Sequence, residues 1–196
     1  MQKGLISVII PCKDRDSIKP FCLASLDNQS FQNFEVIIEE GTQVCVNRNK
    51  GASKAQGEYL FFLDNDIDLT PDCLYRMYTA LEKHPDSDFA YCHFMKVGAL
   101  KGLQQSREWD YEALRKQNYI STMSLVRAEK FLRFNENLKR FHDWDMWLRM
   151  AEGGSHGIFI SEVLFTAVYE EGGISTNKEN YAECVEIIKN LHNLSP

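Results

Sequence analysis

The chain has 196 residues, with 22 Lys and Arg against 28 Asp and Glu and a formal net charge of −6. That length suits one globular domain, and the mild acidity gives no reason to expect a nucleic-acid partner or a polybasic membrane foot. The apolar runs are far shorter than the ~20 residues of a membrane-spanning helix, and the N-terminus lacks a small-residue cleavage site. We therefore expect a cytoplasmic protein without a transmembrane segment, and leave attachment to a membrane surface open.

Apolar patterning predicts strands alternating with helices in the first half of the chain. Unbroken apolar runs predict buried strands, and apolar residues at helical spacing predict helices. The expected strands cover residues 5–11, 34–40, 58–64 and 89–97, and the expected helices cover 18–26, 44–55 and 70–81. The result is an α/β half with a mainly parallel sheet.

The second half is more mixed. Residues 98–118 are polar and irregular, with a helix suggested within 107–117. Further strands are expected at 119–126, 156–160 and 163–169, and helices at 142–152 and 178–192.

Six cysteines are scattered along the chain without a C-x-x-C pair. A disulfide framework or a zinc site would need closer clustering, so we expect buried, reduced thiols.

The strand "EYLFFLD" runs directly into three carboxylates, those of Asp64, Asp66 and Asp68. Open parallel sheets bind ligands beyond the carboxyl ends of their strands. Asp64 and Asp66 are therefore candidates for holding a divalent cation together with a substrate phosphate. The alternative is that these side chains only cap the following turn, which is the expected role of Asp68.

Three motifs occur in order: "ISVIIPCKDR", "NRNKGASKAQGEYLFFLDND" and "HDWDMWLRMAEGG". Together they resemble the inverting nucleotide-sugar glycosyltransferases of family 2, which have the GT-A fold, from Ile6 to about Ile174. The resemblance implies a Rossmann-like, mainly parallel central sheet flanked by helices, with a mixed C-terminal half. It also implies a single domain over 1–196, in which 1–97 bind the nucleotide sugar and 98–196 supply the acceptor site and catalytic base.

Several positions match the donor-binding residues of that family. "PCKDR" resembles its nucleobase loop, Glu39 and Glu40 replace its paired aspartates, Arg48 and Asn49 match its Arg-Asn pair, and Asp64-Asn65-Asp66 matches its Asp-x-Asp. The resemblance implies that the following residues bind the nucleotide sugar: Pro11, Lys13, Asp14, Arg15, Glu39, Glu40, Arg48, Asn49, Asp64 and Asn65. On a helix face that looks inward, the Arg48 guanidinium is suited to diphosphate oxygens. A surface ion pair is the alternative for this residue.

The resemblance assigns the metal site to Asp64 and Asp66, with Mn²⁺ or Mg²⁺ as the cofactor. It implies that Asp66 is the direct ligand and that Asp64 lies near the ribose or the water shell of the metal. It assigns the catalytic base to Asp143, although His142 replaces the Glu that usually precedes it. We expect Asp143 at a helix N-terminus to stay ionised, whereas Asp145 is expected to pair with Arg149, four residues on. Trp144 and Trp147 fit a core better than a sugar platform.

The implied function is metal-dependent, inverting transfer of a sugar from a nucleotide diphosphate sugar to the hydroxyl of a saccharide or lipid-linked saccharide, as in polysaccharide biosynthesis. Two alternatives remain. One is a nucleotide-sugar-binding protein without turnover, favoured by His142 and by the short connection before the Arg48 helix. The other is a sugar nucleotidyltransferase, disfavoured because "PCKDR" lacks the glycines of a phosphate loop. The sequence leaves the donor sugar, nucleobase, acceptor and oligomeric state undetermined.

Overall fold

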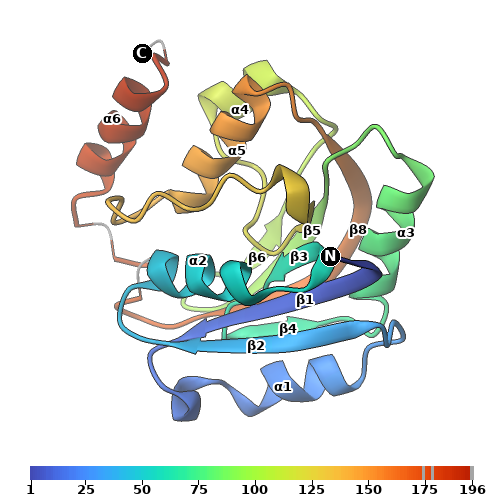
Figure 1. Cartoon of the computed structure of the whole chain (residues 1–196). Helices are drawn as coiled ribbons and strands as arrows, with labels where there is room; N and C mark the ends of the chain where they lie inside the picture. Colours follow the sequence, from blue (N-terminus) through green and yellow to red (C-terminus); the bar gives the residue numbers. More distant parts are fainter. Residues whose placement is uncertain (174, 178, 195–196) are drawn as a thin grey trace.

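The computed structural model describes residues 1–173, 175–177 and 179–194. The described residues form one eight-stranded sheet in the order β2-β1-β3-β7-β5-β8-β4, with β6 paired to β5 (Figure 1). The strands are β1 (Gln2–Cys12), β2 (Phe34–Glu40), β3 (Gly57–Phe62), β4 (Ile67–Leu69), β5 (Phe89–Gly98), β6 (Gly102–Gln104), β7 (Leu125–Arg127) and β8 (Gly157–Tyr169).

The three long ladders, β1 with β2, β1 with β3 and β5 with β8, are parallel. The short ladders involving β4, β6 and β7 are antiparallel. The chain therefore has the predicted α/β fold class, with parallel pairing at the N-terminal strands and mixed pairing beyond them.

Helices cover both faces of the sheet (Figure 1). They are α1 (Pro20–Asp27), α2 (Val44–Lys54), α3 (Cys73–Lys83), α4 (Tyr111–Lys116), α5 (His142–Glu152) and α6 (Tyr181–Leu191), with short 3-10 turns at Arg15–Ser17 and Ala128–Lys130. One buried cluster joins α1 and α3 to Ile6, Val8 and Ile10 of β1. A second joins α2, α4, α5 and α6 to Ile9 and to Leu60 and Phe62 of β3. Because successive strand residues face opposite sides, both faces of β1 are buried and its sequence is continuously apolar.

Helix α2 lies very close to the sheet. A Cβ atom at Gly51 would come within 2.4 Å of a methyl carbon of Ile9. The glycine therefore permits the approach that brings Arg48, one turn earlier, to the end of β3.

The structure corrects several expected elements. The strand expected at 119–126 is reduced to β7, and the two strands expected at 156–160 and 163–169 are one continuous β8, whose pairing with β5 shifts register near His93. Strands β4 and β6 were not predicted, and Asp68 lies within β4 instead of a loop. The expected start of the last helix at Lys178, and the end of the family resemblance at Ile174, lie outside the described residues.

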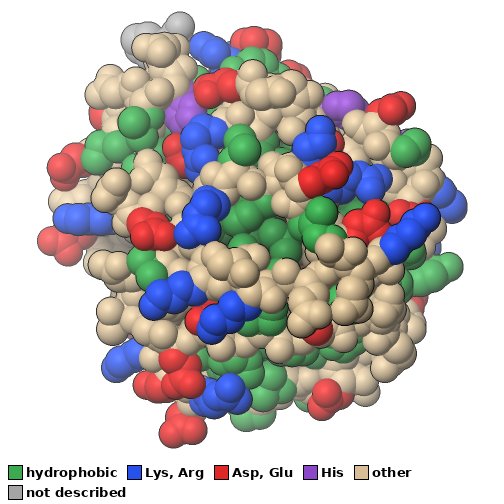
Figure 2. All heavy atoms as spheres, viewed as in Figure 1, with side chains coloured by type: hydrophobic (Ala, Val, Ile, Leu, Met, Phe, Trp, Pro, Cys, Tyr) green, Lys and Arg blue, Asp and Glu red, His purple; other side chains and the backbone are tan. Residues whose placement is uncertain are grey.

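The predicted cysteine chemistry is confirmed for Cys12, Cys22, Cys45, Cys73, Cys92 and Cys184, which are all buried free thiols. Within the described ranges, no helix is both long and apolar enough to cross a bilayer. On the face shown in Figure 2, acidic and basic side chains are interspersed.

Candidate active site

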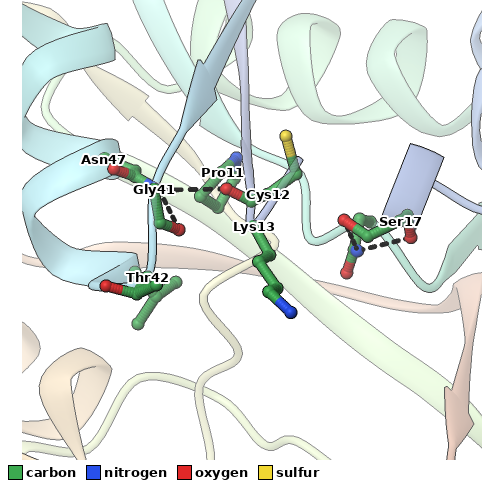
Figure 3. Close-up of a pocket in the computed structure, with 9 residues that line it drawn as sticks. Pro11, Cys12, Lys13, Ser17, Gly41, Thr42 and Asn47 are labelled. Carbon is green, nitrogen blue, oxygen red and sulfur yellow. Dashed lines mark hydrogen bonds between the residues drawn. The ribbon is translucent and has the colours of Figure 1, made fainter. Parts of the chain in front are cut away.

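A cavity of about 310 Å³ opens where β1 and β2 end (Figure 3). Its volume is at the lower end of the range for small-molecule sites, and its place is the edge where parallel α/β sheets bind ligands. Four segments line it, contributing Pro11, Cys12, Lys13, Ser17, Gly41, Thr42, Val44, Asn47 and Asn65. Pro11, Lys13 and Asn65 of the predicted nucleotide-sugar residues are therefore gathered around one cavity.

Asn47 and Gly41 fix the shape of this cavity. The Asn47 Nδ2 group donates to the carbonyl oxygens of Cys12 at 3.1 Å and Gly41 at 2.9 Å. Gly41 has φ +151°, and a Cβ atom there would lie 2.8 Å from Asn47 Oδ1. A side chain at position 41 would therefore disturb the junction between β2 and α2.

The Asp64-Asn65-Asp66 segment lies beside the cavity and is held from two directions. Asn65 donates from Nδ2 to the Ser17 carbonyl at 2.8 Å and accepts from the Lys19 backbone N–H at 3.0 Å. The Val168 N–H donates to the Asp66 carbonyl at 3.1 Å. The acidic segment is thus anchored to the loop after β1 and to the end of β8.

Arg48 forms a buried ion pair with Asp64, with 2.5 Å between Nη2 and Oδ1. Its side chain is only 6% exposed and lies over the Phe134 ring at 5.1 Å. Burial acts to lower the pKa of Arg48, but the charge and hydrogen bond of Asp64, together with smaller contributions that include Asp143, act against burial and the pKa is raised. The surface ion pair considered from the sequence is therefore wrong. Arg48 Nε is buried and has no partner among the described residues.

Asp66 is partly buried next to a second carboxylate. Burial and then the charge of Asp64 raise the pKa of Asp66 to about 6. A divalent cation bound between two neighbouring carboxylates favours the ionised form of both, and so offsets the repulsion that raises the pKa of one of them.

Asp143 is the second residue of α5. Its Oδ1 accepts from the Trp144 N–H at 2.9 Å, and its Oδ2 accepts from Asn118 Nδ2 at 3.0 Å. Burial raises the pKa of Asp143, while these hydrogen bonds and the charges of His142 and Arg48 oppose the rise. The described residues place no salt-bridge partner on Asp143.

Arg48 lies near both Asp64 and Asp143. Both Asp64 and Asp143 act to raise its pKa, so both carboxylates lie near one guanidinium although they are far apart in sequence. His142 lies beside them, its ring nitrogen 3.0 Å from the Leu138 carbonyl oxygen. Burial and the charge of Arg48 lower the pKa of His142, which favours a neutral imidazole.

Tyr169 is a site residue that the sequence analysis missed. Tyr169 is half-buried and ends β8. It directly follows Val168, whose N–H donates to the Asp66 carbonyl. Burial, followed by the charges of Asp66, Asp64 and Asp143, raises the pKa of Tyr169 to about 12. One phenol therefore lies within the influence of all three carboxylates. The available signal was a polar aromatic residue at the carboxyl end of a predicted strand.

Other predicted donor residues lie outside the cavity lining. Asp14 accepts from the Ser17 N–H and caps a 3-10 turn, and Arg15 pairs with Glu40 at 3.3 Å on the surface. Glu39 is buried and pairs with Lys54.

Asn49 is also committed elsewhere. Its side chain exchanges hydrogen bonds with the Phe134 backbone and donates to Glu136. In this conformation Asn49 anchors the loop that carries Phe134, beneath Arg48.

The remaining residues of α5 are structural. Trp144 and Trp147 are 5% and 0% exposed, which confirms their expected place in the core. Asp145 pairs with Arg149 at 2.8 Å, as predicted, and also lies 3.1 Å from His192. Of the two aspartates at the start of α5, Asp143 is therefore the one without a salt-bridge partner among the described residues.

The donor set at Asp64 and Asp66 suits Mg²⁺ or Mn²⁺. Two carboxylates from one turn provide hard oxygen ligands, and these cations commonly take one or two protein carboxylates plus substrate phosphates. The described ranges contain no cluster of three or more His, Cys, Asp or Glu side chains arranged to hold a metal.

Comparison with known sequences matches residues 38–140 to the family described as Glycosyl transferase family 2. An uncharacterized glycosyltransferase of Haemophilus influenzae is 24% identical over 94% of this chain and 76% of its own length. A Campylobacter jejuni protein, named GalNAc(5)-diNAcBac-PP-undecaprenol beta-1,3-glucosyltransferase, is 25% identical over 70% of this chain and 55% of its own length.

Among solved structures, S. aureus TarS 1-349 in complex with UDP-GlcNAc is similar, with a TM-score of 0.73 and 20% identity. The match covers 94% of this chain and 65% of the TarS 1-349 chain, so the present chain spans somewhat less than two thirds of that TarS fragment. A second TarS structure, in complex with UDP, has a TM-score of 0.70.

Proposed function

Because the chain belongs to glycosyltransferase family 2, we propose that it is a metal-dependent, inverting enzyme that transfers a sugar from a nucleotide diphosphate sugar to an acceptor hydroxyl. The observation that carries the proposal is the convergence of Arg48, Asp64, Asp66 and Asp143 beside the cavity at the ends of β1 and β2. A transfer of this kind needs a site for the leaving nucleotide and a base for the acceptor, and this arrangement supplies groups suited to both.

The cavity at the ends of β1 and β2 is the proposed nucleoside site. Thr42 and Ser17 lie on opposite sides of the cavity, and Lys13 extends between them, where its ammonium group is available to a polar ligand (Figure 3). Asn65 joins this cavity to the acidic pair. A nucleoside bound here would direct its diphosphate toward Asp64 and Asp66.

Asp64 and Asp66 would hold Mn²⁺ or Mg²⁺ together with the donor diphosphate. When bound, the cation would supply positive charge that offsets the negative charge building on the leaving group. Arg48 keeps Asp64 in position through the buried ion pair, and it adds a second positive charge close to the diphosphate.

Asp143 is the proposed general base. The acceptor oxygen attacks the anomeric carbon, the bond from that carbon to the diphosphate oxygen breaks, and the hydroxyl proton passes to the Asp143 carboxylate. A single displacement of this kind inverts the anomeric configuration. The hydrogen bonds from Asn118 and the Trp144 N–H orient the carboxylate, and its raised pKa makes it a stronger base than an exposed aspartate.

The names of the relatives suggest where to begin with substrates. The S. aureus neighbour holds UDP-GlcNAc, and the C. jejuni relative is named as a glucosyltransferase acting on an undecaprenol-linked glycan. We therefore propose UDP-sugars as first donors, saccharides or lipid-linked saccharides as acceptors, a cytoplasmic location and a role in polysaccharide biosynthesis.

A nucleotide-sugar-binding protein without turnover is the second candidate. Only three residues separate β2 from α2, and His142 replaces the acidic residue expected before the base. Nucleoside diphosphate release should be measured with Mn²⁺, a panel of nucleotide sugars and a panel of acceptors. Acceptor-dependent release that Asp143→Asn removes supports the enzyme, whereas tight binding without release across both panels supports the binding protein.

A further inference from the structure

The end of β5, the turn and β6 form a hairpin whose tip is unusually apolar. Val97, Leu100 and Leu103 are 36%, 38% and 42% exposed. Every residue from 97 to 103 is exposed. The hairpin therefore groups three exposed apolar side chains within one short segment, and such a group is typical of a surface that contacts another one.

The two faces of the hairpin differ. Met95 is paired with Leu103, and Val97 shares their side of β5 because side chains alternate along a strand. Lys96 lies on the other side, where its ammonium group donates to Gln104 at 3.0 Å. Leu100 and Lys101 lie in the turn that connects β5 to β6. The hairpin therefore has apolar side chains on one side and in its turn, with Lys96 and Lys101 next to them.

The charge of this region is opposite to that of the chain. Residues 95–104, which form the hairpin, contain Lys96 and Lys101 and no Asp or Glu, in a protein whose formal net charge is −6. Basic side chains surrounding exposed apolar ones are complementary to an anionic lipid surface, where apolar groups enter the interface and ammonium groups meet lipid phosphates.

The base of the hairpin adjoins the candidate active site. Gly98 is paired with Tyr169, and the Ala99 N–H donates to the Tyr169 carbonyl at 2.8 Å. Tyr169 in turn follows Val168, whose N–H donates to the Asp66 carbonyl (Figure 1 shows β5 beside β8). A surface contacted by the hairpin tip would therefore lie at the edge of the site that receives the acceptor.

We propose that the β5–β6 hairpin docks this protein on anionic lipid bilayers, with Val97, Leu100 and Leu103 entering the interface and Lys96 and Lys101 contacting lipid phosphates. This inference deepens the proposed function, on which it rests for its purpose, because docking at this position would present a lipid-linked acceptor to the site. The docking itself is a property of the hairpin and is measurable without turnover.

Vesicle sedimentation tests the proposal with the full chain. Vesicles of equal parts phosphatidylcholine and phosphatidylglycerol should bind the protein, pure phosphatidylcholine vesicles should bind it far less, and added salt should weaken the binding. Lys101→Glu should reduce the partition coefficient at least about fivefold, which is the contribution of one lysine near an anionic surface. The double variant Leu100→Ser with Leu103→Ser should also reduce it at least about fivefold, because it removes apolar side chains that would enter the interface.

Two matched variants control for overall charge and hydrophobicity. Lys83→Glu reverses an exposed lysine on α3, and Leu23→Ser removes a leucine on α1 that is 39% exposed. Both should bind anionic vesicles as the parent does. Transfer to a water-soluble acceptor should be unchanged in the hairpin variants, which separates loss of docking from loss of the proposed activity.

Three results would overturn the docking proposal. The first is equal binding to neutral and anionic vesicles, and the second is parental binding by Lys101→Glu. The third is a parent that ignores vesicles but dissociates from dimer to monomer when Leu100 and Leu103 are replaced, which would assign the hairpin to contact with a second copy of the chain. Failure of nucleoside diphosphate release with intact vesicle binding would contradict the proposed function and leave the docking standing.

Discussion

Replacing Asp66 with Asn should stabilise the metal-free protein and remove its response to metal. Burial and Asp64 raise the pKa of Asp66 from its ordinary value of 3.8 to about 6. Each pKa unit corresponds to ~1.4 kcal/mol, so ionising Asp66 in the folded state costs ~3 kcal/mol. Asp66→Asn has no charge to bury and should recover most of this free energy of unfolding.

The sign of the pH dependence follows from the raised pKa. Near pH 3.8 the carboxyl is largely protonated in the folded protein, so the mutation changes stability little. As the pH rises toward 6, the unfolded chain releases the proton while the folded chain retains it, so the parent loses stability relative to Asp66→Asn. Above pH 6 the difference reaches its full value.

Urea unfolding in EDTA at several pH values measures this difference. Asp68→Asn is the matched control because its exposed side chain lies two residues away, and it should change stability by less than ~0.5 kcal/mol. Calorimetry with a nucleoside diphosphate should show Mn²⁺-dependent tightening for the parent and Asp68→Asn but none for Asp66→Asn. A destabilised Asp66→Asn protein, or one that keeps metal-dependent tightening, would refute this account of the acidic pair.

Three further substitutions test the other parts of the site. Asp143→Asn should slow transfer by roughly 10²- to 10⁴-fold while leaving donor and metal binding unchanged, because it keeps the shape and removes the proton acceptor; single-turnover rates at the parent level would contradict the base assignment. Arg48→Lys should weaken nucleoside diphosphate binding, since an ammonium group cannot reproduce a planar guanidinium that holds Asp64 and stacks on Phe134; equal calorimetric affinities would argue against this. Tyr169→Phe should keep the thermal stability but lower donor affinity roughly tenfold, the weight of a hydrogen bond to a charged group, and unchanged affinity and turnover would remove Tyr169 from the site.

The sequence is most informative where burial produces a clear pattern. The bounds of β2 and α5 agree with those predicted, because β2 has β-branched residues at its centre and α5 has an apolar face that packs against the sheet. The strand predicted at 119–126 was wrong over most of its length. Tyr119, Ile120 and Met123 are buried, as their apolar character predicts, but they do not pair with a neighbouring strand. Apolar residues report burial, and a strand additionally needs a hydrogen-bonded neighbour.

Strand β8 illustrates a second limit. Ser161 and Glu162 interrupt its apolar pattern and suggest a break between two strands. The structure carries the strand through these exposed residues, with a register shift against β5 near His93. Such an irregularity depends on the neighbouring strand and leaves no mark in the local sequence.

The sequence also predicts some features of the candidate site and not others. The Asp64-Asn65-Asp66 segment and the N-terminus of α5 could be located from motifs, and Arg48 from its place on an inward helix face. The pairing of Arg48 with Asp64, the commitment of Asn49 to the Phe134 loop and the approach of Tyr169 to the acidic residues depend on contacts between distant segments. Only the folded sheet brings these groups together.

The anomeric configuration of the product tests the central proposal most directly. Proton NMR of the product formed from an α-linked nucleotide sugar gives the coupling constant of the new anomeric proton. Direct displacement with Asp143 as base predicts a β-linked product, formed by the parent and lost in Asp143→Asn. An α-linked product, or a β-linked product formed at the parent rate by Asp143→Asn, would contradict the mechanism.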